Sequence, residues 1–250
     1  MAAPVRDPGT PLRRFVGCGL IGCLAVFAIC GYILYRAVAG AGGFIAALTG
    51  DRSETFALAS PRRFDPLKQF EAIHRRVGQK ARLVSIRATG VRPDGTMDLT
   101  ANFTPAPRAT YEFFAITTKD AAKMPPVGAG RRPHDVWAEQ ITADCYRPGT
   151  RSRITKISGN LRSSYYRVNQ GVTIDRRDPA MIDPDTAAPD PTLTTEEMWK
   201  EALGKGANKD AVATIEYDSN GYSFTISGSG YVLRWKPDGS FEPKQSSYPK

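Results

Sequence analysis

An unbroken apolar run near the N-terminus constrains this chain more than any other sequence feature. From Phe15 to Leu34 there are twenty consecutive residues without a charged side chain. A helix of that length would rise about 30 Å, which is the thickness of the hydrocarbon core of a bilayer, and helices of soluble domains rarely stay apolar for so long. The sequence therefore predicts a transmembrane helix over residues 15–36.

The charges on either side of the run predict its orientation. Arg6, Arg13 and Arg14 precede it, whereas Arg36 is the one basic residue between positions 35 and 50. By the positive-inside rule, residues 1–14 form a cytoplasmic tail and the C-terminal part is translocated. The expected localisation is the inner (cytoplasmic) membrane, single-pass, with the N-terminus inside and the C-terminal domain extracytoplasmic.

Two processing alternatives stay open beside this anchor. Small residues at Ala37 and Ala39 fit a signal-peptidase site, so the chain would be exported after cleavage near Ala39. The apolar run, however, is longer than the roughly 7–15 residues of a cleaved signal. The segment Leu20-Ile21-Gly22-Cys23 resembles a bacterial lipobox, which would place a lipid on Cys23.

The cysteine distribution limits how the remaining chain is stabilised. Three of the four cysteines lie in the apolar run, and Cys145 alone falls in the globular part. No disulfide can therefore form within that part, which must rely on a hydrophobic core. Because unpaired cysteine is among the most buried residue types, we expect the Cys145 thiol to be buried.

Local patterns predict a first unit over residues 64–177. Asp65 and Pro66 begin a helix of about thirteen residues that ends at Gly78, since apolar side chains recur at helical spacing between them. Asp94-Gly95 then separates two alternating segments, which is a strong hairpin signal. Aromatic and β-branched residues predict further strands at 110–116 and 136–142.

The same order of elements returns in a second unit over residues 194–250. Thr194 and Glu197 form a capping box at the start of a helix that Gly204 and Gly206 end. Strands follow at 212–217 and 222–226 around an Asn-Gly turn, and another at 231–235. Each half therefore reads as one helix followed by an antiparallel meander.

This repeated unit, with Asp94-Gly95, Met97 and Leu99 in one copy and Asp218 to Ile226 in the other, resembles the PepSY-like and cystatin-like α+β modules of bacterial envelope proteins. The resemblance implies an inhibitory or binding element and no catalyst, and it covers about forty residues in each half. The predicted fold class is α+β, with an N-terminal transmembrane helix and two helix-plus-meander units. The expected segments are a tail (1–14), an anchor (15–36), a Gly-rich linker (37–63), the first unit (64–177), a Pro/Asp linker (178–193) and the second unit (194–250).

Basic residues are concentrated between the two helices. A candidate anion-binding surface comprises Arg147, Arg151, Arg153, Lys156, Arg162 and Arg167. Such a surface would attract an anionic lipid headgroup or an acidic glycan. The alternative interpretation is an ordinary solvated strand and loop surface that the acidic linker, residues 178–193, partly neutralises by folding back. Tyr165 and Tyr166 could stack on bases, but the expected extracytoplasmic localisation argues against nucleic acid.

Catalytic and metal-binding patterns are weak. His74 and His134 are too few and too widely spaced for a zinc motif, so we expect no metal and no cofactor. We expect His74 to be an exposed or half-buried helical residue. Cys145 and His134 could formally act as nucleophile and base, but any chain with one cysteine and two histidines in its globular part offers such a pairing.

Two function classes remain. The preferred one is a non-enzymatic, membrane-anchored envelope protein that contacts the membrane through residues 15–36 and binds an envelope protein or an anionic lipid or glycan. The rival is a hydrolase that uses carboxylates such as Asp94, Asp98 or Glu112. Convergence of several titratable side chains in one deep pocket would favour the enzyme, and open grooves would favour binding.

Overall fold

The computed structural model describes residues 53–102, 104–158 and 161–248, with the side chains of residues 154–163 left out. The predicted tail, the apolar run, the signal-peptidase site and Cys23 lie outside these residues. In the described part of the chain, no helix is long and apolar enough to cross a membrane. Its two α-helices have 8 and 10 residues, which corresponds to a rise of about 12–15 Å, half of a bilayer core. The predicted single-pass, inner-membrane architecture is wrong for the part of the chain that the structure describes.

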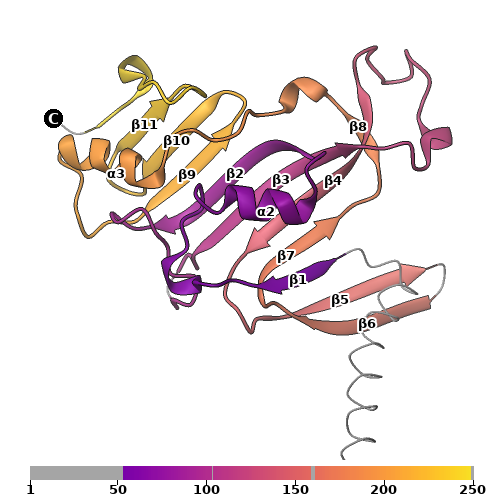
Figure 1. The fold of residues 1–250 in the computed structure, drawn as a ribbon, viewed down its shortest axis with the longest axis horizontal. Coiled ribbons are helices and arrows are strands. Elements are labelled where there is room, and N and C mark those ends of the chain that lie inside the picture. The colour runs from indigo at the N-terminus through magenta and orange to yellow at the C-terminus, as the bar shows by residue number, and fades with distance from the viewer. Residues whose placement is uncertain (1–52, 103, 159–160, 249–250) are drawn as a thin grey trace, which may run out of the picture. The chain divides into compact units, whose positions relative to one another are not determined.

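Antiparallel strands dominate the described chain (Figure 1). Nine strands form one sheet in the order β1-β7-β4-β3-β2-β9-β10-β11, with β8 paired to β4, and β5 and β6 form a separate hairpin. The strands are β1 (Glu54–Ala57), β2 (Arg82–Val91), β3 (Arg108–Ile116), β4 (Val136–Cys145), β5 (Arg151–Ser158), β6 (Leu161–Val168), β7 (Gly171–Arg176), β8 (Ala180–Ile182), β9 (Ala213–Asp218), β10 (Gly221–Ile226) and β11 (Tyr231–Trp235). The helices are α2 (Phe70–Val77) and α3 (Thr195–Gly204), with short 3-10 turns η1 (Pro61–Arg63), η2 (Ala121–Lys123), η3 (Pro184–Thr186) and η4 (Pro243–Gln245).

The two predicted units are joined into this one sheet. Strand β2 pairs with β9 in antiparallel register, with Ile86 opposite Tyr217 and Ala88 opposite Ile215. Apolar residues from both halves form a single buried cluster. The predicted fold class, an anchor followed by two separate α+β units, is therefore wrong. Local patterns indicate individual strands and turns, but they carry no information about the long-range pairing that merges the two halves.

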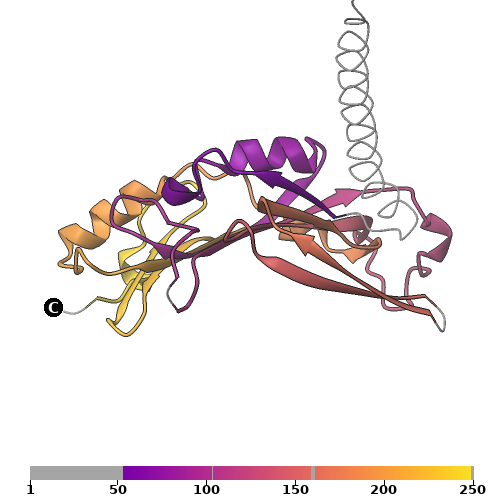
Figure 2. The ribbon, with the colours of Figure 1, turned by 90° about the horizontal axis from the view of Figure 1, so that it is seen from below.

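Both α-helices cover the same side of the sheet, as Figure 2 shows. Helix α2 buries Phe70, Ile73 and Val77 there, and α3 buries Met198 and Trp199. The Trp199 ring meets Phe224 of β10 edge to face, with the ring centroids 4.9 Å apart. An aromatic pair in this geometry adds about 0.5–1.5 kcal/mol beyond its buried area, so α3 is firmly attached to β10.

The starts of the helices agree with their sequence signals to different degrees. The predicted capping box of α3 is confirmed, since Thr194 Oγ1 accepts from Glu197 N at 3.2 Å and Glu197 Oε2 accepts from Thr194 N at 2.8 Å. Asp65 Oδ1 accepts from the backbone of Leu67 and Lys68, as a cap would, but α-helical geometry begins only at Phe70. Helix α2 is thus shorter than the predicted thirteen residues.

The first predicted hairpin is wrong, whereas the second is confirmed. Asp94-Gly95 closes a turn, with Gly95 N donating to Arg92 O at 2.9 Å, but the following residues form no strand. Strand β2 pairs instead with β3 and β9. At the second turn, β9 and β10 do form the expected hairpin, with Gly221 opposite Asp218. The predicted strands at 110–116, 136–142 and 231–235 correspond to β3, β4 and β11.

Candidate functional site

The side of the sheet without helices presents a group of polar side chains from β3 and β4, which we call the polar floor. Because strand residues alternate between faces, Thr110 and Glu112 of β3 lie on this side, opposite Asp144 and Thr142 of β4. All four side chains are half-buried or exposed. Their polarity follows from the fold, since α2 and α3 provide an apolar cover for the other side only.

A wide groove of about 730 Å³ lies at one end of this floor. The loop before β3, the end of β4, the β5–β6 hairpin and β7 line it. We call it the arginine groove; its lining side chains include Asn102, Arg108, Asp144, Tyr146, Arg147, Thr150, Ser152, Arg167 and Asp175. The volume lies within the range of sites for small ligands, about 300–1,000 Å³, and the groove is open, with polar side chains set among the apolar surface of Ala101, Ala106 and Pro107.

Two of its arginines are held by aspartates. Arg108 forms a bidentate pair with Asp144, with Nε 3.1 Å from Oδ1 and Nη2 2.7 Å from Oδ2. Arg167 Nη1 lies 3.1 Å from Asp175 Oδ1, and the side chain of Arg167 is only 15% exposed. Its buried Nε has no hydrogen-bond partner among the described residues. The pairs fix both guanidinium groups in the groove while neutralising much of their charge.

Arg147 is the groove arginine whose charge is least compensated. Its Nη1 donates to Asn102 Oδ1 at 3.3 Å, and no carboxylate lies within ion-pair distance of it in the described part of the chain. The neighbouring Tyr146 ring lies under the Arg108 guanidinium, 5.9 Å from its centre, so an aromatic surface adjoins the charged groups. The groove therefore combines one guanidinium group that has no carboxylate partner among the described residues with hydroxyl, amide and aromatic groups.

The six predicted anion-binding residues do not form one surface in the structure. Arg147 and Arg167 line the arginine groove, together with Ser152. Arg151 and Arg153 flank Ser152 on β5, so strand alternation turns them to the opposite face, where both are exposed. The side chains of Lys156 and Arg162 lie outside the described residues. A continuous basic run in the sequence thus becomes two different surfaces.

Sequence reasoning missed Arg108, Asp144 and Asn102, which complete the groove. Arg108 and Asp144 are 36 positions apart, and they meet because Ala109 pairs with Cys145 in the β3–β4 register. Only the alternation of both strands, combined with that register, could have placed them together. Neither residue belongs to a local motif.

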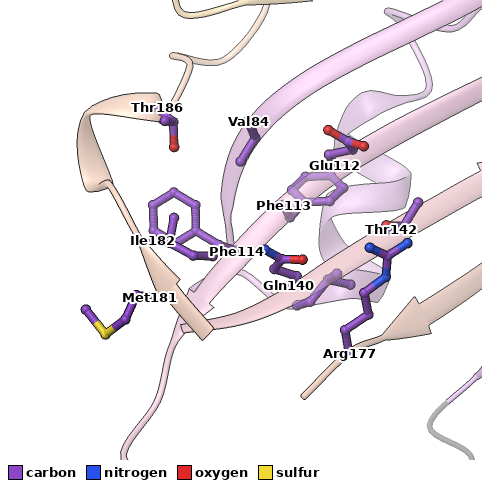
Figure 3. A pocket seen from close by; sticks show the side chains of 11 residues that line it. Val84, Glu112, Phe113, Phe114, Gln140, Thr142, Arg177, Met181, Ile182 and Thr186 are labelled. Carbon is purple, nitrogen blue, oxygen red and sulfur yellow. The ribbon is translucent and has the colours of Figure 1, made fainter. Parts of the chain in front are cut away.

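A smaller cavity of about 280 Å³ adjoins the polar floor near β8 (Figure 3). Phe114, Met181 and Ile182 supply its apolar surface, and Glu112 and Arg177 supply charged groups. Neither Glu112 nor Arg177 is buried, and Glu112 Oε2 accepts a hydrogen bond from Ser85 Oγ at 3.0 Å. The cavity therefore offers an apolar wall with an exposed polar rim.

The carboxylates considered for hydrolysis do not converge. Asp94 and Asp98 each accept hydrogen bonds from a threonine two residues later, Thr96 and Thr100. These bonds lower the pKa of both carboxyl groups, even though partial desolvation opposes the shift. Glu112 is opposite Ser85, six residues before the end of β2, so about 20 Å of strand separates it from the Asp94 turn. Each aspartate therefore stabilises the turn in which it lies.

The formal Cys145 and His134 pair is also excluded by geometry. His134 precedes β4 and Cys145 ends it, so the ten-residue strand holds them about 30 Å apart. Cys145 is fully buried, as predicted, and desolvation raises the pKa of its thiol. The other histidine, His74, is half-buried on α2, where its ring stacks on Phe70 and Phe113.

Comparisons of the chain with protein-family models, with curated proteins and with solved structures found no match. The PepSY-like resemblance accordingly stays a prediction.

Proposed function

We propose that this protein is a non-enzymatic binding protein that holds an acidic glycan in the arginine groove. The proposal rests on one observation: the guanidinium group of Arg147 lines an open groove and has no carboxylate partner in the described chain. A sulfate or carboxylate group on a sugar would supply the missing negative charge. Arg108 and Arg167, already oriented by aspartates, would flank it.

Several features favour a glycan over an apolar ligand. The groove presents the hydroxyl groups of Thr150 and Ser152, the amide of Asn102 and the ring of Tyr146. Sugars offer many hydroxyl groups to such partners and an apolar ring face to an aromatic side chain. Elsewhere, the carboxylates suggested for a hydrolase belong to separate turns and strands, so nothing in their placement supports an enzyme.

The test is heparin binding by the full chain and by Arg147→Ser, measured by titration calorimetry at low ionic strength. A hydrogen bond between charged groups contributes about 1.5–3 kcal/mol, so we expect Arg147→Ser to weaken binding about 10- to 100-fold. Higher salt should weaken wild-type binding, because screening reduces the attraction between exposed charges.

A matched control separates the groove from general basicity. Arg151→Ser/Arg153→Ser removes two charges from the opposite face of the same hairpin, and Arg75→Ser removes one exposed charge from α2. Both should bind heparin within about threefold of wild type, as expected for weak effects of exposed charges. Equal weakening in all three variants would mean diffuse charge attraction and would refute the proposal.

Competition between different anionic ligands for the arginine groove would identify the class of partner. A single-stranded oligonucleotide and anionic phospholipid vesicles are included as competitors, because both are polyanions that an arginine could bind. We expect heparin fragments to compete and the other two probes to compete weakly. If the oligonucleotide or the vesicles bound more tightly than heparin, and lost affinity with Arg147→Ser, the glycan assignment would be wrong.

A further inference from the structure

Three metal-ligating side chains meet beside β8, away from the arginine groove. His134 and Asp135 lie just before β4, and Asp183 follows β8. One donor atom from each, a histidine nitrogen and two carboxylate oxygens, lies within 4.8 Å of the other two. His134 Nε2 is 3.9 Å from Asp135 Oδ1 and 3.7 Å from Asp183 Oδ2. The sequence predicted no metal site because it contains no second suitably spaced histidine.

Asp135 provides an independent indication of a bound ligand. Its side chain is only 9% exposed, and its Oδ1 is buried without a hydrogen-bond partner among the described residues. The other oxygen, Oδ2, accepts from Arg132 N at 2.8 Å, which fixes the carboxyl group. A buried carboxylate oxygen that accepts no hydrogen bond is costly unless a cation compensates it, and the Arg132 guanidinium, with Nε 3.8 Å away, makes no hydrogen bond to this oxygen. This oxygen lies 3.9 Å from His134 Nε2.

Two of the three separations suit a divalent ion after a small adjustment, and the two aspartate oxygens lie within 4.8 Å of each other. Zinc binds histidine nitrogen and carboxylate oxygen at about 2.0–2.2 Å, which places neighbouring ligands of a tetrahedral site about 3.4 Å apart. The two distances from His134 Nε2, 3.7 and 3.9 Å, need to shorten by a few tenths of an ångström. His134 is 48% exposed, so its side chain can make this movement.

The donor set also restricts the type of ion. Imidazole nitrogen suits zinc and its first-row neighbours, whereas magnesium and calcium prefer ligands made of oxygen alone. We propose that His134, Asp135 and Asp183 form a binding site for a zinc-class divalent cation, with water completing the coordination. The ion would fasten the segment before β4 to the segment after β8, which also forms one wall of the smaller cavity.

The guanidinium group of Arg132 would compete with such an ion for the carboxylates of Asp135 and Asp183. Its Nη1 donates to Asp183 Oδ2 at 3.0 Å, and its Nε lies 3.8 Å from Asp135 Oδ1. The guanidinium group therefore contacts the same two carboxylates, and 65% of its side chain is exposed. Removal of this charge should strengthen metal binding, an effect that a merely structural ion pair would not produce.

The experiment is zinc titration of the purified full chain by calorimetry, repeated with cobalt and visible absorption. We expect one site per chain that is lost or weakened at least tenfold in His134→Gln and in Asp183→Asn. Asp185→Asn, which makes the same charge change in the same segment, should leave the affinity unchanged. Arg132→Gln should bind zinc roughly threefold more tightly, the effect expected for one unit charge a few ångströms away in a solvated site.

Cobalt distinguishes this site from the cysteines of the apolar run. Coordination by nitrogen and oxygen gives visible bands without the near-ultraviolet charge-transfer band of a thiolate ligand. Circular dichroism of each variant verifies that it is folded. Wild-type chain that gives no heat of binding, or zinc affinity that is the same in His134→Gln, Asp183→Asn and wild type, would overturn the proposal. Weaker binding by Arg132→Gln would also contradict it.

Discussion

Substitution of Gly95 by alanine tests how the two halves of the chain are joined. Gly95 has φ +74°, and its carbonyl oxygen accepts a buried hydrogen bond from Thr195 Oγ1 at 2.7 Å. A Cβ atom at this position would lie 2.9 Å from Glu196 N and 3.0 Å from Thr195 Oγ1. The turn of the first half is therefore in direct contact with the start of α3 in the second.

The expected cost has three sources. A left-handed conformation costs a non-glycine residue about 1–2 kcal/mol. Moving the backbone of α3 away from the new methyl group costs about 1–3 kcal/mol, as in other overpacked sites. Weakening of the Thr195 hydrogen bond adds about 1 kcal/mol. We expect Gly95→Ala to lower the free energy of unfolding by about 3–6 kcal/mol, or Tm by roughly 6–24 °C in a unit of this size.

Urea unfolding followed by tryptophan fluorescence measures the effect, because Trp199 of α3 and Trp235 of β11 are both buried. Gly128→Ala is the control: Gly128 has φ +96° and no atom within 4 Å of an added Cβ, so it reports the backbone conformation alone. Its cost should stay near 1–2 kcal/mol. If Gly95→Ala costs no more than Gly128→Ala, the contact between the turn and α3 does not exist in solution.

Two further predictions concern ionisable groups. Hydrogen bonds from Thr194 to Glu197 lower the pKa of that carboxyl group below 4.5, so its stabilising contribution is present above pH 4.5 and is lost as the pH falls through the folded-state value. The difference in urea midpoint between wild type and Glu197→Gln should therefore be largest near neutral pH and shrink in acid; a constant difference would contradict the capping-box assignment. Cys145 is fully buried and burial raises its thiol pKa, so peptide mapping after alkylation at neutral pH should find Cys145 modified only in the unfolded chain. Modification at the same rate in the native chain would show that the end of β4 is accessible.

Local sequence signals determined most elements correctly. The capping box at Thr194 and the turn between Asp218 and Gly221 were both predicted from a few adjacent residues, because capping and tight turns depend on local side-chain chemistry. Burial of Cys145 also followed from residue type. The apolar run from 15 to 34 supported an architecture that the described structure does not contain, and a hydropathy pattern in one segment cannot specify the fold of the other two hundred residues.

Only the tertiary structure decided how these elements combine. Asp94-Gly95 looks like a hairpin turn, yet β2 has β3 and β9 as its partners, and the turn instead contacts α3. The basic run that begins at Arg147 divides between a groove and an opposite face because side chains alternate along β5.

Both candidate sites bring together residues that are far apart in the sequence, so they too depend on the tertiary structure. Arg108 meets Asp144 through the β3–β4 register, and His134 meets Asp183 because β8 pairs with β4. The sequence by itself determined the α3 capping box, the β9–β10 hairpin and the approximate positions of α2, β3, β4 and β11, because capping, tight turns and side-chain periodicity are local. The single sheet, the arginine groove and the cluster at His134 were decided by pairing between distant strands, which depends on the free energy of the whole core and leaves no mark in any one segment.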